Sequence, residues 1–137
     1  IHCRRHPLDN ILSMMRSNLE TGNNYTADPV DAAKFLIHQE EILTEVKSRH
    51  GKNIFTFNYD EFVNEPEQTI RPLIEWLDLE WTINYLHPER SERSINTASV
   101  IEARQPISNK SVGGWKNYRE LLKPAEDILN GNSFFNI

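Results

Sequence analysis

Hydrophobic positions recur every three or four residues in the first third of the chain. Apolar side chains at positions 11, 12, 15 and 19 predict a helix over about residues 10–19, which follows a short strand over residues 1–5. A second helix is predicted from Asp28, because an N-cap residue, a proline and an acidic residue stand together there. It should run to about Arg49, and Gly51 is expected to follow it as a C′ glycine.

The pattern changes near residue 53. Residues 53–59, Asn-Ile-Phe-Thr-Phe-Asn-Tyr, are rich in β-forming side chains and predict a buried strand. A third helix is expected to begin with Asn64 as its cap and Glu67 at its third position, and to end near Leu77. Pro72 lies inside this helix and predicts a kink or a later start, because an interior proline removes one helical hydrogen bond.

The last third of the chain has weaker periodicity. We expect irregular structure from Trp81 to about residue 96, a short helix after Thr97 and a loop over residues 106–113. A last helix is predicted to carry the apolar side chains that follow this loop and to be broken at Pro124. Those side chains are Trp115, Tyr118, Leu121 and Leu122.

Strands separated by helices favour a parallel sheet with helical crossovers, and therefore the α/β class. Two strands do not bury a sheet, so we expect this helix-rich chain to be part of a larger domain. Its opening residues, Ile1 to Arg4, read as the interior of a strand and favour the same interpretation. Ligands of such sheets bind at the carboxyl ends of the strands, where Arg5 and Tyr59 stand.

The composition excludes several classes of protein. The 137 residues, 38% hydrophobic and 26% charged, are typical of one folded domain. The single cysteine, Cys3, cannot form an internal disulfide, and the five histidines lack the spacing of metal ligands, so we expect no metal site. No apolar run is long enough to cross a bilayer. We expect a cytoplasmic protein with no membrane span.

The net charge of −5 is unevenly distributed along the chain. Residues 20–96 carry seven basic and fifteen acidic side chains, whereas residues 1–19 and 97–123 are both net positive. The acidic body argues against nucleic acid as a partner, because phosphate backbones require many cations. The two basic segments either converge on one small anion or form ordinary solvated surface.

The segment that follows the first strand carries candidate chemistry. Arg5 leaves the strand, Pro7 turns the chain, and Ser13 follows in the first turns of a helix. A helix N-terminus offers unpaired N–H groups, and arginine and serine add a forked cation and a hydroxyl, which together suit a phosphate. The alternative is an ordinary strand–turn–helix in which Asp9 stabilises the first turn.

Arg5, Pro7, Asp9 and Ser13 have the spacing of the 3′-phosphate-binding motif of sulfotransferases, which this segment resembles. These enzymes use 3′-phosphoadenosine 5′-phosphosulfate (PAPS) as the donor and release the desulfated nucleotide PAP. The resemblance implies that Arg5 and Ser13 hold the 3′-phosphate of PAPS or PAP.

Two later segments are similar to the same family. Residues 57–67 look like its strand that ends in tyrosine before two acids, which implies that Tyr59 lies near the adenine. Without the resemblance, a core tyrosine with a hydrogen-bonded hydroxyl is the favoured interpretation of Tyr59. Residues 97–115 resemble the C-terminal loop of bacterial-type sulfotransferases, which implies that Lys110 closes over the nucleotide. Arg104 is a further candidate contact, to the phosphate or to the acceptor.

The Arg-Lys-Gly clamp of cytosolic animal enzymes is absent from positions 108–110, which favours the bacterial type.

The resemblance implies that residues 1–137 are the C-terminal portion of a single sulfotransferase domain, whose phosphosulfate-binding loop and catalytic base precede this region. The implied reaction transfers a sulfuryl group from PAPS to a hydroxyl or amine of a carbohydrate, a peptide tyrosine or a small alcohol or amine. We expect no catalytic residue in this chain, which alone should be inactive. The alternatives are a nucleotide-binding remnant without turnover and a protein-interaction module that uses the acidic residues 28–92.

Overall fold

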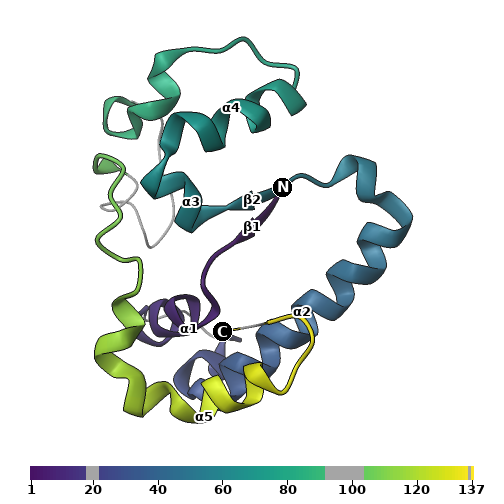
Figure 1. Cartoon of the computed structure of the whole chain (residues 1–137), viewed down its shortest axis with the longest axis vertical. Helices are drawn as coiled ribbons and strands as arrows, with labels where there is room; N and C mark the ends of the chain where they lie inside the picture. Colours follow the sequence, from purple (N-terminus) through teal and green to yellow (C-terminus); the bar gives the residue numbers. More distant parts are fainter. Residues whose placement is uncertain (18–21, 92–103, 136) are drawn as a thin grey trace. The chain divides into compact units, whose positions relative to one another are not determined.

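The computed structural model describes residues 1–17, 22–91, 104–135 and 137, and Figure 1 traces the chain. These residues form two compact units. The strand unit comprises Ile1–Arg4 and Phe55–Lys110, and the helical unit comprises Arg5–Ile54 and Ser111–Ile137. The short helix predicted after Thr97 lies outside the described residues. No helix in the described ranges is both long enough and apolar enough to cross a membrane.

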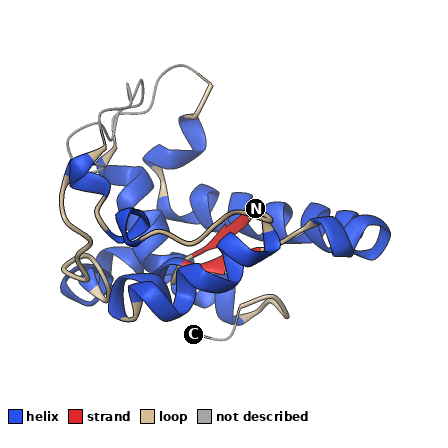
Figure 2. Ribbon diagram, turned by 90° about the horizontal axis from the view of Figure 1, so that it is seen from above, coloured by secondary structure: helices blue, strands red, loops and turns tan. Residues whose placement is uncertain are grey.

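The strand unit is built on two short parallel strands. β1 (His2–Arg4) pairs with β2 (Thr56–Asn58), with His2 opposite Thr56 and Arg4 opposite Asn58. Figure 2 shows the two strands in red, side by side. The parallel pairing confirms the predicted α/β class, although each strand is shorter than its predicted range. Helices α3 (Tyr59–Asn64) and α4 (Pro66–Trp76) follow, and then the 3₁₀ helices η3 (Ile83–Leu86) and η4 (Pro88–Arg90).

Tyr59 was expected to end the second strand, but it is the first residue of α3. The reason is the side chain of Asn58, whose Oδ1 accepts the backbone N–H groups of Asp60 at 3.0 Å and Glu61 at 3.5 Å. Its Nδ2 also donates to the carboxylate of Glu61 at 2.8 Å. This reciprocal cap begins a helix directly after the strand.

Asn64 was expected to cap the next helix, and this expectation is wrong. Its side chain donates back to the carbonyl of Asp60 at 2.7 Å, in the last turn of α3, and α4 begins at Pro66 without a side-chain cap. The helix is continuous through Pro72 to Trp76, so the predicted later start is also wrong. The carbonyl that Pro72 leaves without a helical partner belongs to Gln68, which is exposed, so water can bind it.

Three α-helices make up most of the helical unit. They are α1 (Pro7–Arg16), α2 (Pro29–His50) and α5 (Arg119–Asn130), with the 3₁₀ helices η1 (Asn24–Ala27), η2 (Gly51–Asn53) and η6 (Gly114–Tyr118) between them. Asp28 caps α2 as predicted, because its Oδ1 accepts the N–H groups of Val30 at 2.8 Å and Asp31 at 3.1 Å. Gly51 is not a left-handed C′ residue: its φ is −54°, and the chain continues into η2.

Pro124 does not break the last helix. Trp115 and Tyr118 lie in η6, and α5 runs from Arg119 through Pro124 to Asn130. Leu122 and Leu129 are fully buried on either side of this proline. Each burial stabilises the helix by about 1.5–3 kcal/mol, which offsets the roughly 3 kcal/mol that an interior proline costs.

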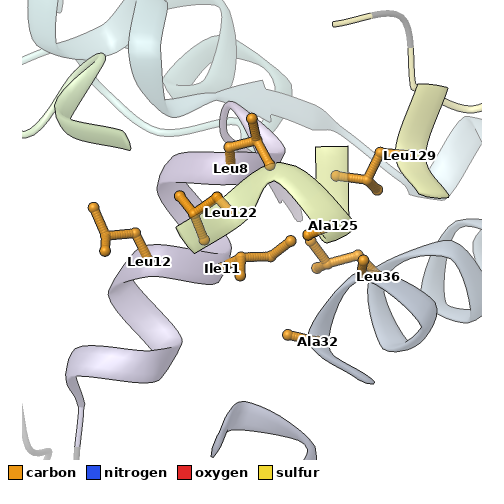
Figure 3. Close-up of a cluster of buried hydrophobic side chains, with 9 residues drawn as sticks. Leu8, Ile11, Leu12, Ala32, Leu36, Leu122, Ala125 and Leu129 are labelled. Atoms are coloured by element: carbon orange, nitrogen blue, oxygen red, sulfur yellow. The ribbon is translucent and has the colours of Figure 1, made fainter. Parts of the chain in front are cut away.

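The core of the helical unit lies where α1, α2 and α5 meet, and Figure 3 shows its side chains. It consists of Leu8, Ile11, Leu12, Ala32, Ala33, Leu36, Leu122, Ala125 and Leu129. The positions on α1 follow helical spacing, so one face of α1 is buried from its first turn. The start of α1, which carries the candidate phosphate motif, is therefore anchored in a packed core.

Candidate functional site

Arg5 lies in the helical unit, between the end of β1 and the start of α1. The residue is half-buried, and its Nη2 donates to the backbone carbonyl of Ser111 at 2.8 Å. A guanidinium carries five N–H donors in a planar fork, so it can bind a loop carbonyl and a phosphate oxygen at the same time. The contact to Ser111 fixes the side chain at the junction between strand and helix.

The N-terminus of α1 follows Arg5 directly. Pro7 is the first helical residue, and the N-cap residue, His6, makes no side-chain cap hydrogen bond. A helix N-terminus of this kind carries a partial positive charge that favours an anion. Ser13 lies further along α1 and is exposed, in contrast to the buried neighbours Ile11 and Leu12. The exposed face of α1 therefore offers a hydroxyl in the helix that begins after Arg5.

Asp9 does more than stabilise the first turn of α1. The residue is only 2% exposed, and its carboxylate accepts the backbone N–H groups of Gly113 at 2.6 Å and Trp115 at 2.8 Å. Gly113 has a φ of +72°, which a residue with a Cβ rarely adopts. Asp9 thus holds the loop of residues 111–115 against the start of α1.

A ring stack joins the same two segments. His6 and Trp115 are stacked, with ring centroids 5.1 Å apart and an interplanar angle of 14°. Trp115 is half-buried and packs against the core of the helical unit. The side chain of Lys116 lies over the 111–115 loop, with Nζ 4.0 Å from the position that a Cβ on Gly113 would take. Sequence reasoning placed Asp9 in the motif but missed its bonds to the 111–115 loop, and it missed His6 and Lys116, because no local pattern links the two segments.

The other predicted residues, Tyr59, Arg104 and Lys110, lie in the strand unit. Tyr59 is half-buried at the start of α3, and Arg104 and Lys110 are exposed. The N–H of Lys110 donates to Ser108 Oγ at 3.3 Å, and Asn109 Nδ2 donates to Asn64 Oδ1 at 3.0 Å. The bond between Asn109 and Asn64 anchors the segment that carries Lys110 on the end of α3.

Comparison with known proteins identifies the family. The sequence model of the sulfotransferase family matches residues 1–83. The chain belongs to the sulfotransferase family.

One relative of this sulfotransferase-family chain is an uncharacterized protein of Aquifex aeolicus (strain VF5), 27% identical over 132 residues. The alignment covers 94% of this chain and 17% of the relative, so the chain spans about a sixth of the relative's length. No solved structure matches the chain.

The family match includes three of the five predicted site residues. Arg5, Ser13 and Tyr59 fall within residues 1–83, whereas Arg104 and Lys110 lie beyond them. The donor groups in the helical unit are a guanidinium, a hydroxyl and a helix N-terminus, and this set fits a phosphate. Within the described residues, no group of three or more His, Cys, Asp and Glu side chains could hold a metal ion.

The strand unit of this family member also contains a cavity of about 650 Å³, between β2, α3 and α4. Three carboxylates line it, from Asp60, Glu61 and Glu65, together with the amides of Asn58, Asn64 and Gln68. None of the five predicted site residues lines this cavity. Its acidic lining does not suit a nucleotide phosphate.

Proposed function

We propose that this sulfotransferase-family chain supplies the 3′-phosphate- and adenine-binding part of a PAPS site, as the C-terminal portion of one sulfotransferase domain. The reaction of the whole domain transfers a sulfuryl group to a hydroxyl or amine of a carbohydrate, a peptide tyrosine or a small alcohol or amine. The observation that carries this proposal is the family match over residues 1–83, which spans the junction of β1 and α1. Arg5 stands there directly before a helix N-terminus without a side-chain cap.

The helical unit supplies the phosphate contacts in this proposal. Arg5 donates charge-assisted hydrogen bonds to the 3′-phosphate, and Ser13 adds a hydroxyl. The N-terminus of α1 contributes its partial positive charge. In the strand unit, Tyr59 packs against the adenine and Lys110 covers the nucleotide, while Arg104 contacts the phosphate or the acceptor.

The contribution of this chain to the reaction is positioning. The 3′-phosphate is remote from the sulfuryl group that is transferred, so its binding energy serves to hold the donor in the orientation required for attack. PAPS supplies the activated sulfuryl group, and by analogy with phosphoryl transfer the reaction depends on alignment and charge stabilisation. The residues of this chain bind and orient the donor, and none of them reacts.

Calorimetric titration with PAP tests the proposal, with 5′-AMP as the ligand that lacks the 3′-phosphate. We expect the folded chain to prefer PAP. Arg5→Ala should weaken PAP binding by about tenfold or more, because a charge-assisted phosphate contact is lost.

Arg49→Ala is the matched control. It removes the same charge from the same unit, at the last turn of α2, where Arg49 pairs with Glu45 at 2.6 Å on the exposed surface. This variant should bind PAP as tightly as the wild type. A folded chain that binds PAP no better than 5′-AMP, or an Arg5→Ala variant with unchanged PAP affinity, would contradict the proposal.

A further inference from the structure

The carboxylate of Asp9 accepts hydrogen bonds from two backbone N–H groups of one loop. Oδ2 accepts from Gly113 and Oδ1 accepts from Trp115, so both oxygens are hydrogen-bonded to the 111–115 loop. The side chain is buried, with 2% of the residue exposed. A buried carboxylate with these two bonds fixes the position of the loop, because charge-assisted hydrogen bonds are shorter and stronger than neutral ones.

The same loop returns to the phosphate motif at Arg5. The backbone carbonyl of Ser111 accepts from Arg5 Nη2 at 2.8 Å. Arg5 and Asp9 are four residues apart, on either side of Pro7, and they bind opposite ends of the 111–115 loop. The stack of His6 on Trp115 is a further contact between the start of α1 and this loop. Three hydrogen bonds therefore connect the Asp9 carboxylate, through the 111–115 loop, to the Arg5 guanidinium.

We propose that Asp9 is a positioning residue of the nucleotide site: by holding the 111–115 loop, it places the Ser111 carbonyl that orients the Arg5 guanidinium toward the 3′-phosphate. This inference rests on the proposed function, because it assigns Arg5 to that phosphate. An arginine side chain loses rotamer freedom when it binds a ligand, and a guanidinium that is already oriented loses less. Asp9 acts on the nucleotide only through Arg5.

A double-mutant cycle on PAP affinity tests this path, with Asp9→Asn as the first change. The amide of asparagine offers one acceptor where the carboxylate offers two, so at least one loop N–H loses its partner. We expect Asp9→Asn to weaken PAP binding by about five- to tenfold in the wild-type background, and by less than about twofold in the Arg5→Ala background, because residues on one path are not additive.

Glu126→Gln is the matched control. It also removes a buried carboxylate of the helical unit, but the carboxylate of Glu126 accepts from the side chains of Arg119 and Lys123, at 3.1 Å each, and not from the 111–115 loop. PAP affinity should stay within about twofold of wild type in both backgrounds. If Asp9→Asn weakens PAP binding by the same factor in both backgrounds, the positioning role is overturned while the role of Arg5 stands. If Arg5→Ala itself has no effect on PAP affinity, the proposed function fails first.

Amide hydrogen exchange on the unmutated chain tests the inference even if Asp9→Asn does not fold. Saturating PAP should slow exchange of the Gly113 and Trp115 amides by about tenfold more than exchange of the Ile128 amide in α5, because ligand binding and loop docking are coupled. Equal slowing at all three amides, or no slowing at Gly113 and Trp115, would overturn the positioning role of Asp9.

Discussion

The two units differ in how their helices are held. In the helical unit, α1, α2 and α5 bury a cluster of nine hydrophobic residues. Seven of them are 0% exposed: Leu8, Ile11, Ala32, Ala33, Leu122, Ala125 and Leu129. In the strand unit, the buried hydrophobic residues among those described are Val63 and Ile74. Four large apolar side chains there, Trp76, Leu77, Leu79 and Ile83, are 40–53% exposed.

The strand unit relies on aromatic contacts instead of a packed core. Phe55 contacts Trp76 with ring centroids 5.6 Å apart, and Phe57 contacts Phe62 at 5.2 Å. The guanidinium of Arg71 lies 4.1 Å from the ring centroid of Trp81. Such pairs contribute about 0.5–1.5 kcal/mol each, which is less than the burial of one leucine. Arg5 and Ser13, which are predicted to hold the 3′-phosphate, thus belong to the better-packed unit.

Leucine truncations in the two units should separate them most clearly. Leu122→Ala removes a fully buried side chain from the helical core and should cost about 2–5 kcal/mol of unfolding free energy. Leu79→Ala removes the same atoms from a site that is 50% exposed and should cost less than about 1 kcal/mol. Urea denaturation measures both values, and equal losses would contradict the difference in packing.

Removal of the helix caps should give a smaller effect. Asp28→Ala deletes the cap of α2, whose first turn leads into the core residues Ala32 and Ala33, and should lower the unfolding free energy by about 1 kcal/mol. Asn58→Ala deletes the cap of α3 and should chiefly speed amide exchange at Asp60 and Glu61, because α3 is short and buries little. Global destabilisation by Asn58→Ala that exceeds that of Asp28→Ala would reverse the ranking of the units.

The smallest expected difference between the two units is in how their stability changes at acid pH. In the helical unit, the hydrogen bond from Lys123 holds the pKa of Glu126 below its usual 4.5, with a further contribution from Arg119, although burial opposes the shift. A carboxyl whose pKa is lowered by folding stabilises the protein above its unfolded pKa, and this contribution is lost as pH falls through the folded pKa. The stability that Glu126 adds is therefore present above about pH 4.5 and lost below it.

Glu126→Gln should remove part of the fall in melting temperature below pH 4.5. Glu89 is the corresponding carboxyl in the strand unit, and its pKa is also lowered. The main cause is a backbone hydrogen bond at Glu89 itself; burial opposes the shift, and a hydrogen bond with His87 adds to it. Its side chain is 27% exposed, against 7% for Glu126, so solvent screens it more. Glu89→Gln should flatten the acid side of the stability curve less, and a larger effect at Glu89 would contradict this order.

Local signals in the sequence predicted the fold well where one segment determines its own structure. The aspartate, proline and acid at residues 28–31 begin α2 as expected. Prediction failed where a side-chain contact overrides the local pattern. The cap by the Asn58 side chain begins a helix at Tyr59, and the burial of Leu122 and Leu129 keeps α5 continuous past Pro124. These outcomes depend on contacts that propensity and spacing do not contain.

The same distinction between local signals and long-range contacts applies to the candidate site. Arg5 and Ser13 follow from a motif within nine residues, and the family match covers them. The partners of Asp9 lie 104 and 106 residues further along the chain, so no local pattern could reveal them. The assignment of Tyr59, Arg104 and Lys110 to the nucleotide stays a prediction.

The bonds between the two ends of the helical unit have a consequence for the order of folding. Arg5 and Ser111 are 106 residues apart, whereas the cap of α2 joins residues two and three apart. Closing a chain segment of about 100 residues costs about 2 kcal/mol more entropy than closing one of about ten, so such contacts form late. During synthesis, Arg5 and Ser13 leave the ribosome long before Ser111 and Gly113. The phosphate motif acquires its supporting loop only after residues 111–115 have emerged.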